Sequence, residues 1–418
     1  MLLHTVSPGQ TLSAISARYG VPLSRIAAWN ALSPPYALAV GQSLLLPEAA
    51  EVYTIRPGDT LSAVARRAGL TLNALRRVNP GLGDGIYPGQ TLVLRLADAQ
   101  GRRIEVNGYA YPFADPAVLR PILPYTTYLT PFTYGIGPDA SLVPLDDGGL
   151  LAMAREVGVQ PLMHLSTLTE SGNFSTARAT EVLSSPALSD RLISEAAATV
   201  REKGYRGLDL DFEFLGAANA AAYADFAFRL RAALNGLPLI TALAPKTSDG
   251  QPGLLYEGHD YGALGAVSDA VLLMTYEWGY TYGPPMAVAP LPNVRRVVEY
   301  ALSRIPAEKI FLGFPNYGYD WPLPYERGTT RARSISNPEA VWLAAEFGAE
   351  IRFDDGAQTP YFNYTAGGTA HEVWFEDPRS SKAKYDLVSE YSLRGVGFWN
   401  FMRPFPAGFA LLGAMFEL

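Results

Sequence analysis

Residues 207–214 read Gly-Leu-Asp-Leu-Asp-Phe-Glu-Phe, and this stretch decides the fold that we expect for most of the chain. Apolar and acidic residues alternate strictly, which is the period of a β-strand with two unlike faces. One face carries Asp209, Asp211 and Glu213, and the other carries leucine and phenylalanine. Carboxylates this close on a buried strand repel one another. Such a cluster is tolerated where neighbouring groups offset the repulsion or where a reaction uses the acids. The alternative is an edge strand with a solvated acidic face.

The composition limits the classes of protein that this chain can belong to. Its 418 residues are 48% hydrophobic, which allows a large core and more than one domain. A net charge of −7 without a basic run argues against nucleic acid or an anionic membrane surface as a partner. The absence of cysteine excludes disulfides and thiolate metal sites. We expect no metal and no cofactor, and we expect structural or surface roles for the four widely spaced histidines, His4, His164, His259 and His371.

The N-terminus lacks a basic segment followed by an apolar one, and no run of about 18 apolar residues occurs. We therefore expect neither a conventional secretory signal nor a membrane span.

The first hundred residues contain an internal repeat, because residues 6–15 (VSPGQTLSAI) recur as residues 55–64 (IRPGDTLSAV). Each unit reads as strand, helix, helix, strand, with a Pro-Gly turn before the first helix and Gly20 or Gly69 at its end.

The two units, residues 1–48 and 49–97, resemble LysM modules, which bind glycans carrying N-acetylglucosamine, as in peptidoglycan and chitin. The resemblance implies that glycan lies between the first turn and the loop before the last strand. It implies these contact residues: Gly9, Gln10, Thr11, Leu12 and Tyr36 in the first unit, and Gly58, Asp59, Thr60, Leu61, Ile86 and Tyr87 in the second. For the leucines and glycines the alternative is a core or turn role. Thr11 and Thr60 can also cap the first helix.

A polar stretch at residues 96–101 marks the expected domain boundary. Beyond it, short apolar strands alternate with helical patterns such as 189–203, 217–234 and 293–304, which is typical of a parallel sheet covered by helices. The eight expected strands are 104–111, 128–134, 160–165, 207–213, 237–243, 270–276, 309–316 and 395–401. This pattern predicts an α/β fold, a (β/α)8 TIM barrel over residues 102–418. Residues 324–378 predict a small antiparallel α+β insertion in it.

In such a barrel, catalytic groups lie at the C-terminal ends of the strands. Residues two apart on a strand are separated by ~6.6 Å, so Asp211 lies one step below Glu213 and Asp209 two steps below. A carboxyl beside another acid keeps its proton near neutral pH, which suits Glu213 as a proton donor. Two acids from one strand face cannot easily flank a sugar carbon. We therefore expect the substrate to supply its own nucleophile.

Residues 207–213 resemble the signature of the family 18 glycoside hydrolases, the chitinase-like group. The resemblance implies that the substrate's 2-acetamido oxygen attacks C1 with retention of configuration. Glu213 then protonates the leaving oxygen and later activates water, while Asp211 orients the acetamido group. The signature usually begins with a further Asp, where this chain has Arg206, which puts a third supporting carboxylate in doubt.

Other strand ends fit the same resemblance. Residues 274–277 (Met-Thr-Tyr-Glu) match a segment whose tyrosine, here Tyr276, hydrogen-bonds the acetamido carbonyl, with Met274 and Glu277 beside it. Trp399 resembles the floor of the sugar subsite. Further substrate-binding candidates at strand ends are Ser166, Asn316 and Tyr317, for which capping of the barrel is the alternative. Exposed aromatic residues expected to stack on sugars or to pack loops are Trp278, Tyr280, Tyr282 and Trp321.

Two LysM units followed by this barrel resemble the spore cortex-lytic N-acetylglucosaminidases of spore-forming bacteria, which commonly lack a conventional signal peptide. We expect hydrolysis of β-1,4 bonds at N-acetylglucosamine in peptidoglycan, by a monomer located at the spore coat, the cortex or the cell wall. The expected partners are peptidoglycan or chitin-type glycans, with no nucleic acid and no membrane. Two alternatives stay open: a chitinase, and a glycan-binding protein without activity. Non-catalytic relatives usually lose the terminal Glu, which is present here as Glu213.

Overall fold

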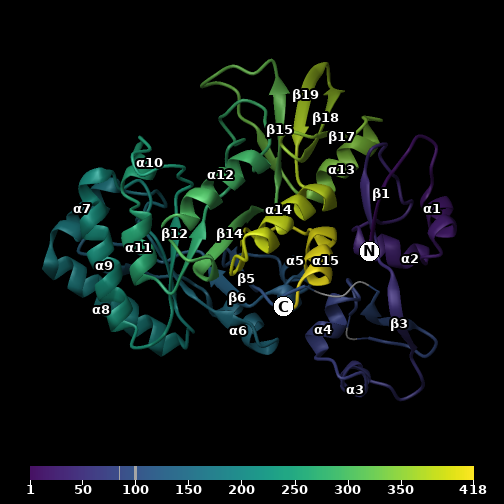
Figure 1. The fold of residues 1–418 in the computed structure, drawn as a ribbon, viewed down its shortest axis with the longest axis horizontal. Helices are drawn as coiled ribbons and strands as arrows, with labels where there is room; N and C mark the ends of the chain where they lie inside the picture. The colour runs from purple at the N-terminus through teal and green to yellow at the C-terminus, as the bar shows by residue number, and fades with distance from the viewer. Residues whose placement is uncertain (84, 98–100) are drawn as a thin grey trace.

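The computed structural model describes residues 1–83, 85–97 and 101–418 (Figure 1). Two small units at the N-terminus lie beside a much larger α/β unit, and the chain ends close to them. The small units carry the repeat. The large unit carries the acidic strand.

Each small unit is a two-stranded antiparallel sheet packed on two helices. The first has β1 (Leu2–Thr5), α1 (Leu12–Tyr19), α2 (Leu23–Trp29) and β2 (Ser43–Leu46), and the second has β3 (Ala49–Thr54), α3 (Leu61–Arg67), α4 (Leu72–Arg77) and β4 (Thr91–Leu96). The first helix of each unit begins as expected, because the Thr11 hydroxyl accepts from the Ala14 amide and Thr60 does the same in α3. The expected order of strand, helix, helix and strand is therefore present twice.

The large unit is built on a parallel sheet that closes on itself. Its order is β10-β11-β12-β13-β14-β20-β5-β6-β9, and β9 (Gln160–Pro161) is separated from β10 (Met163–Ser166) only by Leu162. The sheet thus begins and ends on one segment, and the Leu162 amide donates to Leu129 while the Met163 amide donates to Gly207. The other strands are β5 (Glu105–Ala110), β6 (Tyr128–Pro131), β11 (Leu208–Asp211), β12 (Leu239–Leu243), β13 (Ala270–Leu273), β14 (Ile310–Pro315) and β20 (Gly395–Trp399). The eight expected strands and the TIM barrel are confirmed.

Helices surround the barrel (Figure 1). The longer ones are α6 (Gly148–Glu156), α7 (Thr176–Ser184), α8 (Pro186–Lys203), α9 (Ala220–Ala233), α11 (Tyr261–Val267), α12 (Leu291–Leu302), α14 (Pro378–Glu390) and α15 (Pro406–Met415). Short helices are α5 (Pro116–Leu119) and α10 (Leu254–Glu257), and a small hairpin pairs β7 (Gly135–Ile136) with β8 (Leu142–Val143). Leu208 and Leu210 of β11 pack outward into the helix layer, so the alternation turns Asp209 and Asp211 toward the barrel interior.

A five-stranded antiparallel sheet with one helix is inserted between β14 and α14. Its order is β16 (Arg333–Ile335), β15 (Gly318–Leu323), β19 (Thr369–Trp374), β18 (Thr359–Ala366) and β17 (Arg352–Asp354), and α13 (Asn337–Glu346) packs against it. This sheet begins at Gly318 rather than at residue 324, because residues 318–323 form its second strand. The expectation that Trp321 is exposed is wrong. Its side chain is fully buried in this sheet's apolar cluster and its Nε1 donates to the Gly283 carbonyl.

The first small unit is packed firmly on the large one. Trp29 and Leu45 belong to the same buried apolar cluster as the helices around the barrel. The Ile351 amide donates to the Val40 carbonyl at 2.9 Å, and Arg379 donates to the Gly41 carbonyl at 3.2 Å. The expected domain boundary at residues 96–101 includes residues 98–100, which lie outside the described residues.

Candidate active site

Asp209 lies deepest in the acidic strand and is fully buried. Its Oδ2 accepts hydrogen bonds from the Tyr109 hydroxyl at 2.7 Å and from Asn107 Nδ2 at 3.2 Å, both delivered by β5. Burial raises the pKa of Asp209, although the charge of His164 and the bond from Tyr109 oppose this rise. Asp209 is thus held through Oδ2 by β5, while its Oδ1 has no hydrogen-bond partner among the described residues.

Asp211 is the next acid toward the mouth. His164 comes from the neighbouring strand β10, and its Nε2 lies 3.6 Å from Asp211 Oδ2. The other ring nitrogen of His164 lies 2.5 Å from the Thr133 hydroxyl. Asp211 Oδ1 is buried and has no hydrogen-bond partner among the described residues. The described residues thus leave one oxygen of Asp211 without a donor, which is unusual for a buried polar atom.

Glu213 lies beyond the end of the strand. The sequence predicts a strand through residue 213, whereas β11 ends at Asp211, because Phe214 adopts a left-handed backbone with φ 56° that turns the chain out of the sheet. The Glu213 side chain is half-buried. Burial, and then the charge of Asp211, raise the pKa of Glu213 well above its ordinary value. Glu213 therefore holds its proton to a higher pH than an ordinary glutamate, while part of the residue stays accessible.

Tyr276 and Trp399 close the site from the other strands. Burial raises the pKa of Tyr276 well above its ordinary value, and the nearby charges of Asp211 and Glu213 add to this effect, so its hydroxyl remains a donor. Trp399 ends β20 and its ring lies 5.6 Å from that of Tyr109 and 4.9 Å from that of Phe132. Met274 packs in the same interior cluster as these aromatic rings. The structure thus brings Tyr276, Met274 and Trp399 to the end of the barrel that carries the acids.

An aromatic groove of about 260 Å³ continues from Trp399. Glu277 lines this groove, with a left-handed backbone at φ 65°, and its carboxylate accepts from the hydroxyls of Tyr317 and Tyr319. Burial raises the pKa of Glu277, which these two hydroxyls partly offset. The groove is lined by Tyr111, Phe113, Glu277, Tyr317, Tyr319, Ser334, Trp399, Asn400, Met402 and Arg403. Glu213 and Asp211 are not among its lining residues.

Two other predicted substrate-binding residues have structural partners. The Asn316 amide nitrogen donates to the carbonyls of Asn400 and Arg403, at 3.0 and 2.8 Å, and so holds the segment after β20. Ser166 is fully buried and its hydroxyl accepts from Thr133 and from the Leu168 amide. Both side chains hydrogen-bond to protein groups near the strand ends, which agrees with the capping role that the sequence left open.

Several residues of the site were missed by the reasoning from sequence. Asn107, Tyr109, Thr133, Tyr319 and Arg403 all contact a predicted site residue or line the groove. Tyr109 and Thr133 were detectable, since both fall at the C-terminal end of an expected strand. His164 was expected to be structural or at the surface, and it is buried beside Asp211.

In the small units, the predicted glycan-binding residues have mixed environments. Leu12 and Leu61 are buried in the cores of their units, and Tyr36 and Ile86 pack against those cores. Gly9 and Gly58 have positive φ of 76° and 84°, as a Pro-Gly turn requires. Thr11 and Thr60 cap helices, Gln10 accepts from the Ser7 amide, and Tyr87 is 65% exposed.

Asp59 replaces Gln10 in the second unit and holds the same turn. Its carboxylate accepts from the Arg56 amide at 2.8 Å, from the Tyr53 hydroxyl at 2.8 Å and from Arg67. These bonds, the one from the Arg56 amide first, lower the pKa of Asp59 to about 2. Within the described ranges, no group of three or more His, Asp or Glu side chains is placed to hold a metal ion. No helix in the same ranges is long and apolar enough to cross a membrane.

Comparison with known proteins adds independent findings. Residues 152–403 match the model of the glycosyl hydrolases family 18, and residues 4–47 and 53–95 each match the LysM domain. The chain is 40% identical to the cortical fragment-lytic enzyme of Bacillus subtilis strain 168, over 100% of this chain and 99% of that one. The crystal structure of the spore cortex-lytic enzyme SleL of Bacillus megaterium QM B1551 has 36% identity and a TM-score of 0.84, over 99% of this chain and 98% of that one. SleL of Bacillus cereus has 33% identity and a TM-score of 0.85, over 100% and 98%.

Proposed function

Because this chain belongs to the glycosyl hydrolases family 18 and carries two LysM domains, we propose that it cleaves β-1,4 bonds at N-acetylglucosamine in spore cortex peptidoglycan. It is a glycosidase by its family. The observation that carries the proposed mechanism is the half-buried Glu213, whose pKa is raised by burial and by Asp211, at the mouth of the barrel. The names of its close relatives support cortex fragments as the substrate.

In the proposed reaction, Glu213 gives its proton to the oxygen between two sugars as the bond from that oxygen to C1 breaks. The acetamido oxygen of the same sugar forms a bond to C1 on the opposite face, giving an oxazolinium ion. Water then attacks C1 as the bond from C1 to the acetamido oxygen breaks, and it loses a proton to Glu213, which restores both the acid and the acetamido group. Two displacements at C1 retain its configuration.

The supporting groups have distinct tasks in this proposal. The free Oδ1 of Asp211 accepts from the acetamido N–H, and the Tyr276 hydroxyl donates to the acetamido carbonyl oxygen. Asp209 supports Asp211 from below through the hydrogen bonds it receives from β5. Trp399 provides the floor under the sugar ring. Met274 shapes the interior wall, and Ser166, Asn316 and Tyr317 hold the rim.

An opposed carboxylate nucleophile lacks support. Glu277 is the acid that lines the groove, and its carboxylate is engaged by Tyr317 and Tyr319. A nucleophile would need an unengaged oxygen across the sugar from Glu213. The acetamido group of the substrate therefore takes that role in our proposal.

The LysM domains would hold the enzyme on its polymer. We propose that the turns at Gly9–Leu12 and Gly58–Leu61, with Tyr36, Ile86 and the exposed Tyr87, contact glycan. Such anchoring raises the local concentration of an insoluble substrate without altering the chemistry. It also places the enzyme, as a monomer, at the spore cortex or the cell wall.

The test is mass spectrometry of defined cortex fragments and of N-acetylglucosamine oligomers after incubation with the enzyme. We expect new reducing ends at N-acetylglucosamine in the cortex fragments. Glu213→Gln should abolish them, whereas Glu308→Gln should not, since Glu308 is exposed just before β14, at the opposite end of the barrel. Cleavage of chitin oligomers without cleavage of cortex fragments would identify a chitinase instead. Full activity of Glu213→Gln would refute the proposed mechanism.

A further inference from the structure

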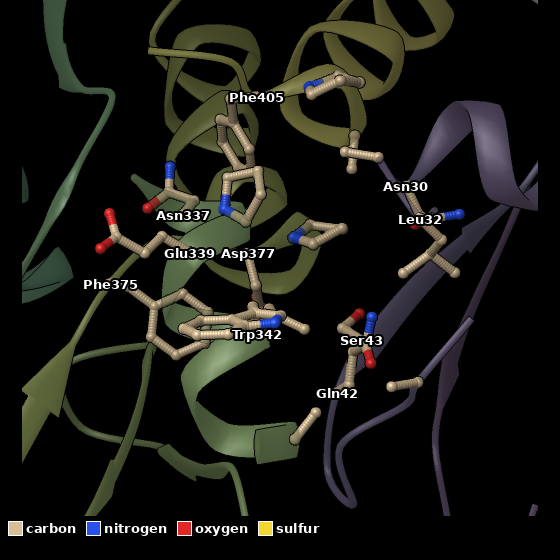
Figure 2. A pocket seen from close by; sticks show the side chains of 18 of the residues that line it. Asn30, Leu32, Gln42, Ser43, Asn337, Glu339, Trp342, Phe375, Asp377 and Phe405 are labelled. Atoms are coloured by element: carbon tan, nitrogen blue, oxygen red, sulfur yellow. The ribbon is translucent and has the colours of Figure 1, made fainter. Parts of the chain in front are cut away.

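A second cavity, of about 640 Å³, lies between the first LysM domain and the catalytic domain (Figure 2). One wall is the segment 30–43 of the LysM domain, and the other is formed by α13, residues 375–378 and the start of α15. Figure 2 shows Gln42 and Ser43 on the LysM side, facing Trp342, Phe375 and Phe405 on the catalytic side. We call this cavity the interdomain cleft. Its volume is in the range of cavities that bind small ligands.

Three buried polar atoms in the walls of this cleft have no hydrogen-bond partner among the described residues. They are Ser43 Oγ, Asn337 Nδ2 and Glu376 Oε1. Their residues are only 7%, 2% and 1% exposed, so the atoms are withdrawn from bulk water. A buried polar group without a partner costs ~1–3 kcal/mol, and its presence calls for an explanation. A ligand in the cleft that reached these three atoms would supply the partners that they lack.

The rest of the lining is suited to a sugar. The apolar walls include Trp342, whose side chain is 57% exposed on α13, and Phe375. An exposed tryptophan ring offers a flat surface to the apolar face of a pyranose. The three unpaired atoms offer a hydroxyl, an amide donor and a carboxylate acceptor. Sugar hydroxyls and acetamido groups can satisfy all three, since they both donate and accept.

The charges of the lining favour a neutral ligand over an anionic one. Glu339, Glu376 and Asp377 line the cleft, and they are paired with Arg333, Lys384 and Arg379 respectively. No lysine or arginine is among the described residues of the lining. A peptide stem rich in carboxylates would find no cation in the lining to pair with, because the neighbouring Arg333, Arg379 and Lys384 are already paired with acids of the cleft. A neutral saccharide meets no such cost.

The cleft adjoins the active site. Ser334 and Arg403 line the aromatic groove, while Asn337 and Phe405, on the same two segments, line the cleft. Arg403 donates to the side chain and to the carbonyl of Ser334, so the two segments are joined between the cavities. On its other side, the cleft is lined by Pro35 and Ala37, which belong to the loop that the LysM resemblance assigns to glycan binding. The first turn of that unit, residues 9–12, does not line the cleft.

From these observations we infer that the interdomain cleft binds a neutral β-1,4-linked N-acetylhexosamine segment, between the LysM groove and the catalytic groove. The inference rests on the proposed function, since the same glycan would occupy all three places. Ser43, Asn337 and Glu376 hydrogen-bond the sugar, and Trp342 stacks on it. One glycan chain held at the cleft would be presented to the active site by two rigidly packed domains.

The test uses the full-length Glu213→Gln enzyme labelled with 5-fluorotryptophan, whose six tryptophans give separate fluorine NMR signals. Trp342→Phe and Trp399→Phe assign the signals of the cleft and of the active site. We expect both signals to shift on titration with the tetramer of N-acetylglucosamine. In the Ser43→Ala variant, the tetramer concentration that produces half of the full Trp342 shift should rise at least fivefold. The concentration that produces half of the full Trp399 shift should stay unchanged. Ser13→Ala, on the exposed face of α1, is the matched control and should change neither.

Each outcome separates the two proposals. A Trp399 signal that shifts while the Trp342 signal does not would overturn the cleft inference and leave the proposed function standing. A Trp399 signal that does not respond would count against the proposed function itself. A Trp342 signal that responds to the free stem peptide but not to the tetramer would identify a peptide site and overturn the inference. The same result follows if Ser43→Ala has no effect.

Discussion

The imidazole Nε2 of His164 lies 3.6 Å from Oδ2 of Asp211, while its Nδ1 lies 2.5 Å from the Thr133 hydroxyl. The two residues come from adjacent strands, β10 and β11, and both point into the barrel. The imidazole therefore lies beside Oδ2 of Asp211, while Oδ1 has no hydrogen-bond partner among the described residues. The acids proposed as the catalytic pair thus have a buried imidazole beside them.

We predict that His164→Gln lowers kcat about tenfold and changes KM less than twofold, because Asp211 loses its orientation in the transition state rather than in the bound ground state. Steady-state kinetics on a soluble aryl glycoside of N-acetylglucosamine would measure both constants. His371→Gln is the control, since His371 lies on β19 and contacts Asp320 in the insertion. Equal rises in KM and falls in kcat would point to a general loss of structure instead.

Glu213 should set the alkaline limb of the pH profile. Its pKa is raised in the folded enzyme, and only the protonated form donates a proton, so kcat/KM falls as pH rises through that pKa. The native state also holds this proton more tightly than the unfolded chain, so its contribution to stability is lost over the same rise in pH. Glu213→Gln should therefore raise Tm at pH 8 relative to wild type and have little effect on it at pH 4. A Tm difference that does not depend on pH would contradict the raised pKa.

Tyr276→Phe should lower kcat about 10- to 100-fold, because one hydrogen bond to a charged transition state contributes ~1.5–3 kcal/mol. The phenyl ring keeps the packing of the site, so the far-ultraviolet circular dichroism and Tm should stay close to wild type. Tyr300→Phe is a suitable control, since the Tyr300 hydroxyl donates to Asp249 on the outer surface. Unchanged kcat in Tyr276→Phe would remove this residue from the mechanism.

Lys384→Met should destabilise the catalytic domain by ~3–5 kcal/mol, because Lys384 Nζ is fully buried 2.9 Å from Glu376, and its loss leaves a buried charge unpaired. Chemical denaturation monitored by tryptophan fluorescence would measure the change. Adding Glu376→Gln should recover part of the lost stability. Lys382→Met, which breaks an exposed pair with Asp386 on the same helix, should cost less than about 1 kcal/mol.

Deleting residues 1–96 is a poor test of the LysM domains, because Trp29 and Leu45 belong to the core that they share with the catalytic domain. Tyr87→Ala is cleaner, since this side chain is 65% exposed. We expect Tyr87→Ala to weaken pull-down by insoluble cortex about threefold and to spare turnover of the aryl glycoside. Phe228→Ala removes another exposed aromatic side chain, on α9 in the helix layer, and should leave the pull-down unchanged. Equal pull-down for Tyr87→Ala and wild type would remove this residue from the glycan contact.

The sequence by itself determined the two small repeats, the barrel and the strand that carries the acids. These features depend on local patterns: a repeated Pro-Gly turn followed by a helix cap, and an alternation of apolar and acidic residues that a strand converts into two faces. The side of β11 on which Asp209 and Asp211 lie follows from that alternation, since Leu208 and Leu210 must join the core.

Only the tertiary structure decided which groups surround those acids. Tyr109 reaches Asp209 from about 100 positions earlier in the chain because barrel closure brings β5 and β11 to opposite walls of one interior. Trp321 is buried rather than exposed because its strand belongs to the inserted sheet, and the position of Glu213 off the strand depends on the turn at Phe214. The cleft between Ser43 and Trp342 exists only because two domains pack together. Such contacts join residues that no local period connects, so no pattern in the sequence could reveal them.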